Sequence, residues 1–591
     1  MNRSGGGLAP HRPRWTWDEL AWALGFALAL ATLTTVPYLW GAAQQPYGLV
    51  YLGFVFNPDE PNVHLSWIRQ AAEGACLLRN GFTSEPHDGR FFNLFMLGAG
   101  RLAHWLHATP YQVWAALRVL CAGALTLGVY AALAGFTHDR KLRRLGTLVV
   151  TLSSGLGWLW VSCGSRLDPV DVEPGLVMPE ALTFLTLYLN PLFALSMLLL
   201  LGALLGGERA LRTHRVGPAL AAGVLGGLLA NVHTYDTIPL GAVLTAYLLA
   251  LAVRERRWCW RRCGLWALIA LLVAPGVAWQ ANLIRSDALY AAKANTITGT
   301  PALRVMLISY GLLVPLAVVG AWGGLRRRRE AVLFWTLWAA VHFACIFLPT
   351  SSFPFQRKMA EGLHLPLAVL AAAGLQASAR WLGRRLAWRV LAARRERFGA
   401  LWSVRQEALV LRQAWARRFA ALGVVALLPS NALFVLDSLG ALRNNNQSKL
   451  HMLMPPLYLP AADLDAVRWL GANLPADAVV LCLPFVGNYV PGLTGRTVYL
   501  GHWAETIGFE QKLRDYQSFV RDPRKPAEKL AFLRAKGITH VFVGSYEQAA
   551  AGGRWPVPAG LERIYPAPAP GTPPVAVYRV PPASPEAAPK R

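Results

Sequence analysis

The sequence is poor in charged residues, and poorest in acidic ones. Asp, Glu, Lys and Arg make up only 15% of the 591 residues, and 32 acidic residues stand against 58 Lys and Arg. Soluble globular domains carry charge on about a quarter of their residues, so this composition excludes that class. The hydrophobic share of 54% and the mean hydropathy of +0.34 indicate a membrane protein.

Cysteine is also scarce. The seven cysteines are scattered singly, apart from Cys259 and Cys263, so the sequence indicates neither a disulfide framework nor a zinc site. The sequence has no internal repeat. A small-residue cleavage site is absent after the first apolar run, so residues 20–40 are interpreted as a retained anchor.

The sequence is rich in long apolar runs. A helix needs roughly 17 to 25 apolar residues to cross about 30 Å of hydrocarbon. About eleven runs are interpreted as spans, and the fifth and sixth are short enough to form one tilted or shielded hairpin. The runs are 20–40, 111–135, 145–163, 182–205, 216–232, 238–253, 265–281, 302–322, 331–348, 363–379 and 419–439.

The net charge of +26 comes from Arg and Lys residues that gather in every second connection between these runs. By the positive-inside rule those connections are cytoplasmic, the N-terminus lies inside and the C-terminus lies outside. A basic cytoplasmic face that meets membrane lipids explains the charge without a nucleic-acid ligand. The largest basic stretch, 380–418, is predicted to form an amphipathic helix lying on the membrane surface.

The outer side then receives a long first loop and a final domain. In the loop, residues 41–110, two segments have helical spacing, and they either lie in the membrane interface or pack against the bundle. After the bundle, 1–439, mixed helix and strand patterns predict an extracytoplasmic α/β domain over 440–580, and residues 581–591 are predicted to be a disordered tail.

Ionisable residues gather near the predicted outer ends of the spans, where each must be balanced against the bilayer. Acids in early loops and bases in later ones would suit a phosphorylated lipid, with carboxylates for proton abstraction or metal binding and cations for the phosphate. The residues are Asp59 and Glu60; Asp168, Asp171 and Glu173; His233, Tyr235 and Asp236; Arg285 and Lys293; and Arg357, Lys358, Glu361 and His364.

Two further segments leave alternatives open. "HTYD", with His233 and Asp236, fits a hydrogen-bonded pair, a metal site or a plain turn, and a functional role would be contact with the lipid phosphate or an attached sugar. "LTGRTVYLGHWAET" offers His502, Trp503 and Glu505 for sugar stacking and binding, or is an ordinary loop at a strand end.

A polytopic bundle, an acidic pair just after the first span in "NPDEPNVHLSWIRQAAEG", interfacial helices and a soluble outer domain resemble the GT-C superfamily of integral-membrane glycosyltransferases. "TFLTLYLNPLFALS" and "NVHTYDTIPL" also resemble bacterial membrane proteins grouped near the protein-mannosyltransferase and aminoarabinose-transferase branches. The resemblance implies a polyprenyl-phosphate-linked sugar donor, a glycan, lipid or protein acceptor, and a place in the bacterial cytoplasmic membrane with the active site on the extracytoplasmic side.

The resemblance also implies roles for single residues. Asp59 would be the general base, and Glu60 would raise its pKa or share a divalent metal such as Mg or Mn with it. Asp168 or Asp171 would be the second acid. Arg357 and Lys358, with Lys293 and Arg285 in reserve, would neutralise the departing lipid phosphate.

The sequence departs from parts of the family. It lacks the Trp-Trp-Asp signature of oligosaccharyltransferases and the histidine and arginine signature of O-antigen ligases, which leaves monosaccharide transfer. A transporter or flippase of lipid-linked sugars is the alternative, although charges here cluster at the outer boundary, with Arg118 as the main exception. A non-catalytic assembly protein that binds polysaccharide is a third hypothesis.

Overall fold

The structure is a computed structural model that describes residues 16–162, 178–398, 404–446, 455–521, 526–553, 555–566 and 575–582. The chain divides into two compact units, and each is treated by itself. The helical unit consists of Met1–Thr34, Arg118–Gly276 and Thr298–Phe434, and the mixed unit consists of Thr35–Leu117, Val277–Ile297 and Val435–Arg591. The domain boundary expected at residue 440 stays a prediction, and residues 583–591 of the expected tail lie outside the described residues.

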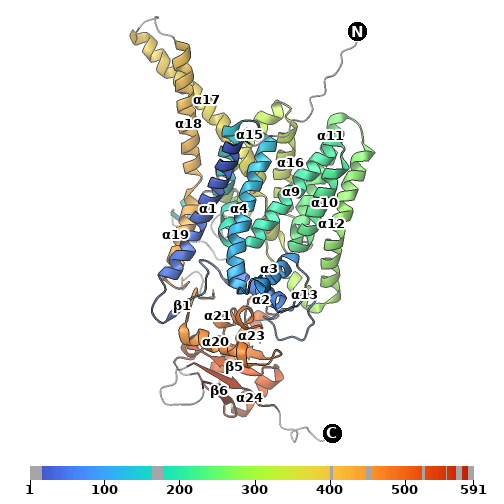
Figure 1. Cartoon of the computed structure of the whole chain (residues 1–591), viewed down its shortest axis with the longest axis vertical. Helices are drawn as coiled ribbons and strands as arrows, with labels where there is room; N and C mark the ends of the chain where they lie inside the picture. The colour runs from blue at the N-terminus through green and yellow to red at the C-terminus, as the bar shows by residue number, and fades with distance from the viewer. Residues whose placement is uncertain are drawn as a thin grey trace. The chain divides into compact units, whose positions relative to one another are not determined.

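The helical unit is built from long apolar helices (Figure 1). Four of its helices, α1 (Trp17–Ala43), α4 (Pro110–Phe136), α12 (Trp260–Ser286) and α19 (Pro429–Arg443), continue into the mixed unit. The others are α5 (Arg140–Leu152), α6 (Gly157–Ser162), α8 (Thr183–Leu189), α9 (Pro191–Thr213), α10 (Val216–Val232), η1 (Thr234–Asp236), α11 (Thr237–Glu255), α14 (Leu303–Tyr310), α15 (Leu313–Arg326), α16 (Glu330–Cys345), η2 (Gln356–Ala360), α17 (His364–Phe398) and α18 (Val404–Ala426).

The mixed unit combines short helices with two sheets. Its helices are α2 (Asp59–Ala72), α3 (Leu94–Trp105), α13 (Ala288–Ala294), α20 (Ala461–Asn473), α21 (Pro484–Gly487), α22 (Val490–Thr494), α23 (Phe509–Arg521), α24 (Pro526–Ala535) and α25 (Ser545–Ala550). Its strands are β1 (Leu49–Tyr51), β2 (Tyr458–Pro460), β3 (Val479–Leu481), β4 (Thr497–Val498), β5 (His540–Val543), β6 (Glu562–Tyr565) and β7 (Ala576–Arg579).

All eleven predicted apolar runs contain helix, but not all form one continuous helix. Among the described residues, seven helices are long and apolar enough to cross a membrane, or eight if α14 and α15, which meet at a bend of 77°, count as one span. The fold is therefore that of a multi-pass membrane protein. The predicted count of eleven is not confirmed.

Four predicted spans are interrupted, and three of the breaks, α5/α6, α14/α15 and α18/α19, lie together in the helical unit. The backbone N–H of Leu156, between α5 and α6, donates to the carbonyl of Ile308 near the α14/α15 bend at 3.0 Å. The hydroxyl of Ser154 donates to the carbonyl of Leu427, between α18 and α19, at 2.8 Å, and Ser430 donates to the Gly155 carbonyl at 3.0 Å. Non-helical backbone is tolerated at membrane depth only where protein or a water-filled cavity satisfies its polar groups, and here the breaks satisfy one another.

The basic stretch 380–418 does not form the separate helix that the sequence predicted. Its described residues, 380–398 and 404–418, form the end of α17 and the start of α18, which pack side by side (Figure 1). Gly383 allows the close approach, since a Cβ there would lie 2.7 Å from the Arg412 carbonyl oxygen. The apolar run from residue 364 and the first part of the basic stretch thus lie in one continuous helix, α17, which packs against α18.

The larger sheet of the mixed unit has the strand order β4-β3-β5-β7-β6, with β3 parallel to β4 and β5, and β7 antiparallel to β5 and β6. The helix and strand patterns predicted after residue 440 are present as α20 and α24 and as β3, β5 and β7. A buried cluster that includes Leu481, Tyr499, Phe519 and Trp555 forms the core against the sheet. The predicted α/β architecture is confirmed.

Candidate functional site

Asp59 opens α2, one of the two helices predicted in the first outer loop. Prolines at positions 58 and 61 flank it, and the first turn of a helix tolerates proline because its N–H groups have no intrahelical acceptor. Within the mixed unit, α2 packs against α3 and α22. Gly100 of α3 permits this approach, since a Cβ there would lie 2.4 Å from the Ala71 Cβ. The buried face of α2 thus carries Asp59 into the interior of the unit.

The carboxylate of Asp59 is held by an amide that the sequence did not single out. Asn488, between α21 and α22, donates from Nδ2 to Asp59 Oδ1 at 2.5 Å. Asn62, one turn further along α2, donates in turn to Asn488 Oδ1 at 3.1 Å. All three side chains are buried, with exposures of 7% for Asp59, 1% for Asn488 and 2% for Asn62. The chain of two amides fixes the orientation of the carboxylate.

Burial raises the pKa of Asp59 above its usual range, while the nearby His502 and the hydrogen bond from Asn488 lower it by smaller amounts. Glu60, its predicted modifier, is exposed, so the loss of water around Asp59 is the main cause of the shift. A carboxylate whose pKa is moved toward neutrality is better suited to general base catalysis than an ordinary one.

His502 is buried beside this group with a defined orientation. Its Nδ1 accepts the backbone N–H groups of Ala504 at 3.0 Å and Glu505 at 3.2 Å, so Nε2 is the ring nitrogen left to donate a hydrogen bond. Trp503 stacks on the His502 ring with centroids 6.0 Å apart and is itself 49% exposed. An exposed indole beside buried polar groups suits the apolar face of a sugar.

Lys293, which was predicted to bind phosphate, and Glu505, which was predicted to bind sugar, form an ion pair with each other. Lys293 of α13 contacts Glu505 Oε1 at 2.5 Å, and its ammonium lies 5.0 Å from the centre of the Trp67 ring. Asn80 donates to Glu505 Oε2 at 3.3 Å. The mixed unit therefore brings together Asp59, Lys293, His502, Trp503 and Glu505 from the predicted set, whereas Arg285 is exposed at the end of α12.

A second cluster lies in the helical unit, where "HTYD" forms the short helix η1. His233 Nδ1 lies 3.1 Å from Asp236 Oδ2 and 3.3 Å from Glu361 Oε2. Ligand atoms of the three residues lie within 4.8 Å of one another, the spacing of a metal site. Asp236 and Glu361 are fully buried. The pair and the turn considered from the sequence are therefore both present, and Glu361, which had no assigned role, completes the group.

Two cationic residues of η2, Arg357 and Lys358, precede Glu361 of this cluster. The Lys358 ammonium lies 5.0 Å from the centre of the Tyr235 ring, and that ring packs on Phe355 with centroids 4.6 Å apart. Arg357 lies 3.5 Å from Glu180, an acid that the sequence analysis did not name. The helical unit thus brings His233, Tyr235, Asp236 and Lys358 together through contacts between η1 and η2.

The remaining predicted acids, Asp168, Asp171 and Glu173, lie in 163–177, outside the described residues. The residues missed from the sequence are mainly amides. Asn488 is a single amide in mainly apolar surroundings, within "VGNYVPG", whereas Asn62 stands among other polar residues in "DEPNVHLS". A lone amide in such a position signals a buried hydrogen bond, but its partner is 426 residues away in the chain and no local pattern indicates it.

No family model and no curated protein matches this chain significantly. Solved structures do resemble it. An oligosaccharyltransferase from Archaeoglobus fulgidus has a TM-score of 0.50 at 12% identity, over 91% of this chain and 72% of its own. The same enzyme, AglB, in complex with an inhibitory peptide and a dolichol-phosphate has a TM-score of 0.50 at 12% identity, over 91% and 71%.

ArnT from Cupriavidus metallidurans, bound to undecaprenyl phosphate, has a TM-score of 0.47 at 14% identity, over 94% of this chain and 98% of its own. Identities this low establish the fold and leave the activity to be argued from the site. The architecture expected from the acidic pair, the bundle and the C-terminal sheet is confirmed: the chain has the fold of the GT-C glycosyltransferases.

Proposed function

We propose that the protein is a membrane glycosyltransferase that moves a sugar from a polyprenyl-phosphate-linked donor to an acceptor at the extracytoplasmic face. The observation that carries this proposal is Asp59, a buried carboxylate with a raised pKa at the start of α2 in a GT-C fold. The similar AglB structure that contains dolichol-phosphate supports a lipid-phosphate donor.

In the proposed reaction, Asp59 accepts the proton of the acceptor hydroxyl or amine as the acceptor attacks the anomeric carbon. The bond between that carbon and the phosphate oxygen breaks, and the lipid phosphate leaves with the bonding electrons. Arg357 and Lys358 neutralise its charge. His502, Trp503 and Glu505 orient the sugar or the acceptor, and Lys293 holds Glu505 in place through their ion pair.

The donor atoms of His233, Asp236 and Glu361 fit a hard divalent cation such as Mg or Mn. Two carboxylates and one imidazole meet within 4.8 Å, and Asp236 Oδ1 is buried without a hydrogen-bond partner. A bound cation would supply positive charge for the donor phosphate. This triad, rather than the pair Asp59 and Glu60, is the better candidate metal site on the described residues.

The substitution Asp59→Asn tests the assignment of the base. The amide of the variant keeps an oxygen that can accept from Asn488, so the local hydrogen bond survives while the basic group is lost. Loss of a general base lowers turnover by about 10²–10⁴-fold. Transfer is measured as release of undecaprenyl phosphate from a set of undecaprenyl-phosphate-linked sugars, and lipid binding is measured as a shift in Tm with undecaprenyl phosphate.

Glu60→Gln is the matched control, since it removes an exposed carboxylate from the next residue. The proposal expects the Asp59 variant to bind the lipid and fail to transfer, and the Glu60 variant to retain more activity. Transfer by Asp59→Asn at the wild-type rate would exclude Asp59 as the base. Transport of an intact lipid-linked sugar across vesicles without release of the lipid phosphate would favour the flippase hypothesis.

A further inference from the structure

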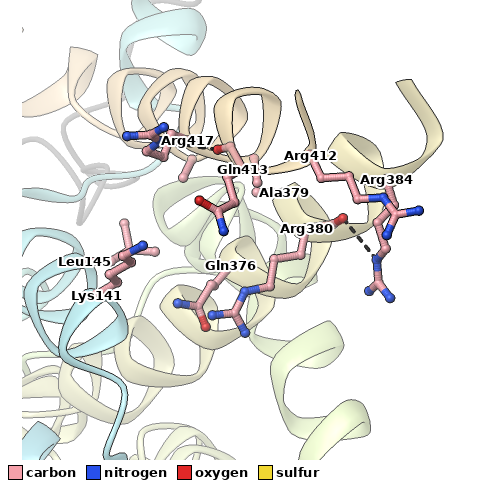
Figure 2. A pocket seen from close by; sticks show the side chains of 11 residues that line it. Lys141, Leu145, Gln376, Ala379, Arg380, Arg384, Arg412, Gln413 and Arg417 are labelled. Carbon is pink, nitrogen blue, oxygen red and sulfur yellow. Dashed lines mark hydrogen bonds between the residues drawn. The ribbon is translucent and has the colours of Figure 1, made fainter. Parts of the chain in front are cut away.

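A basic pocket lies between α5, α17 and α18 of the helical unit (Figure 2). Its volume is about 500 Å³. Five cations line it, and the rest of the lining is two glutamines, Leu145 and three alanines. The cations are Lys141, Arg380, Arg384, Arg412 and Arg417. This site plays no part in the proposed sugar transfer.

The helices hold these cations in place. Arg380 donates to Asp139 Oδ2 at 2.7 Å, and Asp139 caps the N-terminus of α5, so this one arginine is neutralised within the protein. The close packing at Gly383 fixes α17 against α18 beside Arg412. The arrangement of the cations therefore follows from helix packing and does not need a ligand to form.

The other arginines are left with unused positive charge. Among the described residues, no carboxylate lies within ion-pair distance of Arg384, Arg412 or Arg417. Within the described part of the chain, Arg384 and Arg417 donate only to backbone carbonyls, those of Arg380 and Gln413. The Nε of Arg412 is buried without a hydrogen-bond partner. Like charges this close repel one another, and a buried N–H without an acceptor costs about 1 to 3 kcal/mol, so an anion in the pocket would relieve both costs.

The surroundings of the pocket are those of a membrane interface. Arg384 also lines a second hollow on α17, together with Trp381 and Trp388, and these two indoles are 49% and 64% exposed. The Arg385 guanidinium stacks on Trp381 at 4.3 Å. Exposed tryptophans beside arginines are typical of the headgroup level of a membrane.

We propose that this pocket binds the headgroup phosphate of an anionic phospholipid. Arginine forks match phosphate oxygens in pairs of hydrogen bonds, and the uncharged side chains of Leu145 and the three alanines give the glycerol and upper acyl chain an apolar wall. A free phosphate would use the cations but leave this wall in water. The apolar part of the lining therefore favours a lipid over a soluble anion.

The test uses the delipidated full-length protein in detergent and follows Tm during titration with phosphatidylglycerol. We expect phosphatidylglycerol to raise Tm, and phosphatidylcholine and inorganic phosphate to leave it unchanged. Each arginine facing an anionic lipid strengthens binding about 5-fold. The double variant Arg412→Gln/Arg417→Gln should therefore weaken the apparent affinity about 25-fold.

The matched control is Arg327→Gln/Arg329→Gln, which removes the same charge from exposed positions after α15. Equal weakening in the control would show general attraction to the surface and overturn the proposal. A Tm rise with inorganic phosphate as large as that with the lipid would also overturn it in favour of a free-oxyanion site. If the double variant does not fold, Arg417→Gln alone, at an exposed residue, should still weaken binding about 5-fold, and unchanged affinity there would refute the site.

Discussion

Asn488 should set the protonation of Asp59. It is the only neighbour among the described residues for which a hydrogen bond to the side chain of Asp59 is recorded, and this bond favours the charged carboxylate because the amide N–H donates to it. The substitution Asn488→Leu removes the donor and keeps the volume of the side chain. Asn62 then also loses its acceptor. The protonated form of Asp59 should consequently become more populated at a given pH.

The size of the effect follows from the strength of that bond. A hydrogen bond to a charged group contributes about 1.5 to 3 kcal/mol, and one pKa unit corresponds to about 1.4 kcal/mol. Both residues are buried, so water does not compete for this hydrogen bond. We therefore expect Asn488→Leu to raise the pKa of Asp59 by a further 1 to 2 units, in the same direction as the burial of the carboxylate.

The measurement does not require the natural substrate. Hydrophobic carbodiimides modify protonated carboxyl groups, so the pH at which labelling of Asp59 falls to half, read by peptide mass spectrometry, reports its pKa. Glu547 is an internal reference in the same unit, since burial raises its pKa to about 7. Its half-labelling pH should not move in the variant. Under the proposed function, the acidic limb of kcat/KM should shift upward together with the labelling of Asp59.

An unchanged half-labelling pH for Asp59 in a folded Asn488→Leu variant would refute this account of the hydrogen bond. A shift of the same size at both Asp59 and Glu547 would indicate loosening of the whole unit. The conservative variant Asn488→Gln, whose longer amide can still donate, should return the pKa of Asp59 toward the wild-type value.

Two further predictions concern the helical unit. Gly374→Ala should lower the free energy of unfolding by about 1 to 3 kcal/mol, because a Cβ there would lie 1.9 Å from the carbonyl oxygen of Leu316 in α15. The control Gly323→Ala, where a Cβ would have nothing within 4 Å, should be neutral. Equal changes in Tm for the two variants would contradict the close packing of α15 and α17. Asp236→Asn should weaken Mn²⁺ binding, measured by electron paramagnetic resonance, by at least about 10-fold. The control Glu330→Gln, which changes an exposed acid, should leave Mn²⁺ binding unchanged. Undiminished binding of Mn²⁺ to the Asp236→Asn variant would exclude the triad as the metal site.

The sequence predicted the elements of the fold well, because their signals are local. Apolar runs and period-2 strands are written in consecutive residues, and the helices and strands of the α/β part appeared where the pattern indicated. The breaks in the spans were not predicted. Gly155 lies in an apolar run whose pattern indicates one helix, but the backbone at the break passes so close to Ser309 that a Cβ at Gly155 would lie 1.8 Å from the Ser309 carbonyl oxygen. A contact between residues 154 positions apart produces no periodic pattern in the local sequence.

The residues of the candidate site also fall into those with a local signal in the sequence and those without one. Asp59 could be found because its position after the first span is itself a signal, and "HTYD" could be found because polar residues interrupt apolar runs. Asn488 and Glu361 could not be given roles, because each acts through a partner distant in sequence. The pairing of Lys293 with Glu505 was equally hidden, since the two residues had been assigned separately to the phosphate and the sugar.

The broken helices bear on the choice between an enzyme and a transporter. In transporters, unwound backbone commonly lines the substrate path, and its free carbonyls coordinate ions. Here the carbonyls at the breaks are used inside the protein: Ser154 donates to Leu427, Ser430 to Gly155, and Asn431 to Leu152 at 2.8 Å. Backbone groups paired in this way are not available to a passing substrate. The polar groups at these breaks are therefore satisfied within the helical unit. The ionisable groups suited to chemistry lie elsewhere in each unit, around Asp59 in the mixed unit and in the η1 and η2 turns of the helical unit. This arrangement favours the enzyme hypothesis over the transporter hypothesis.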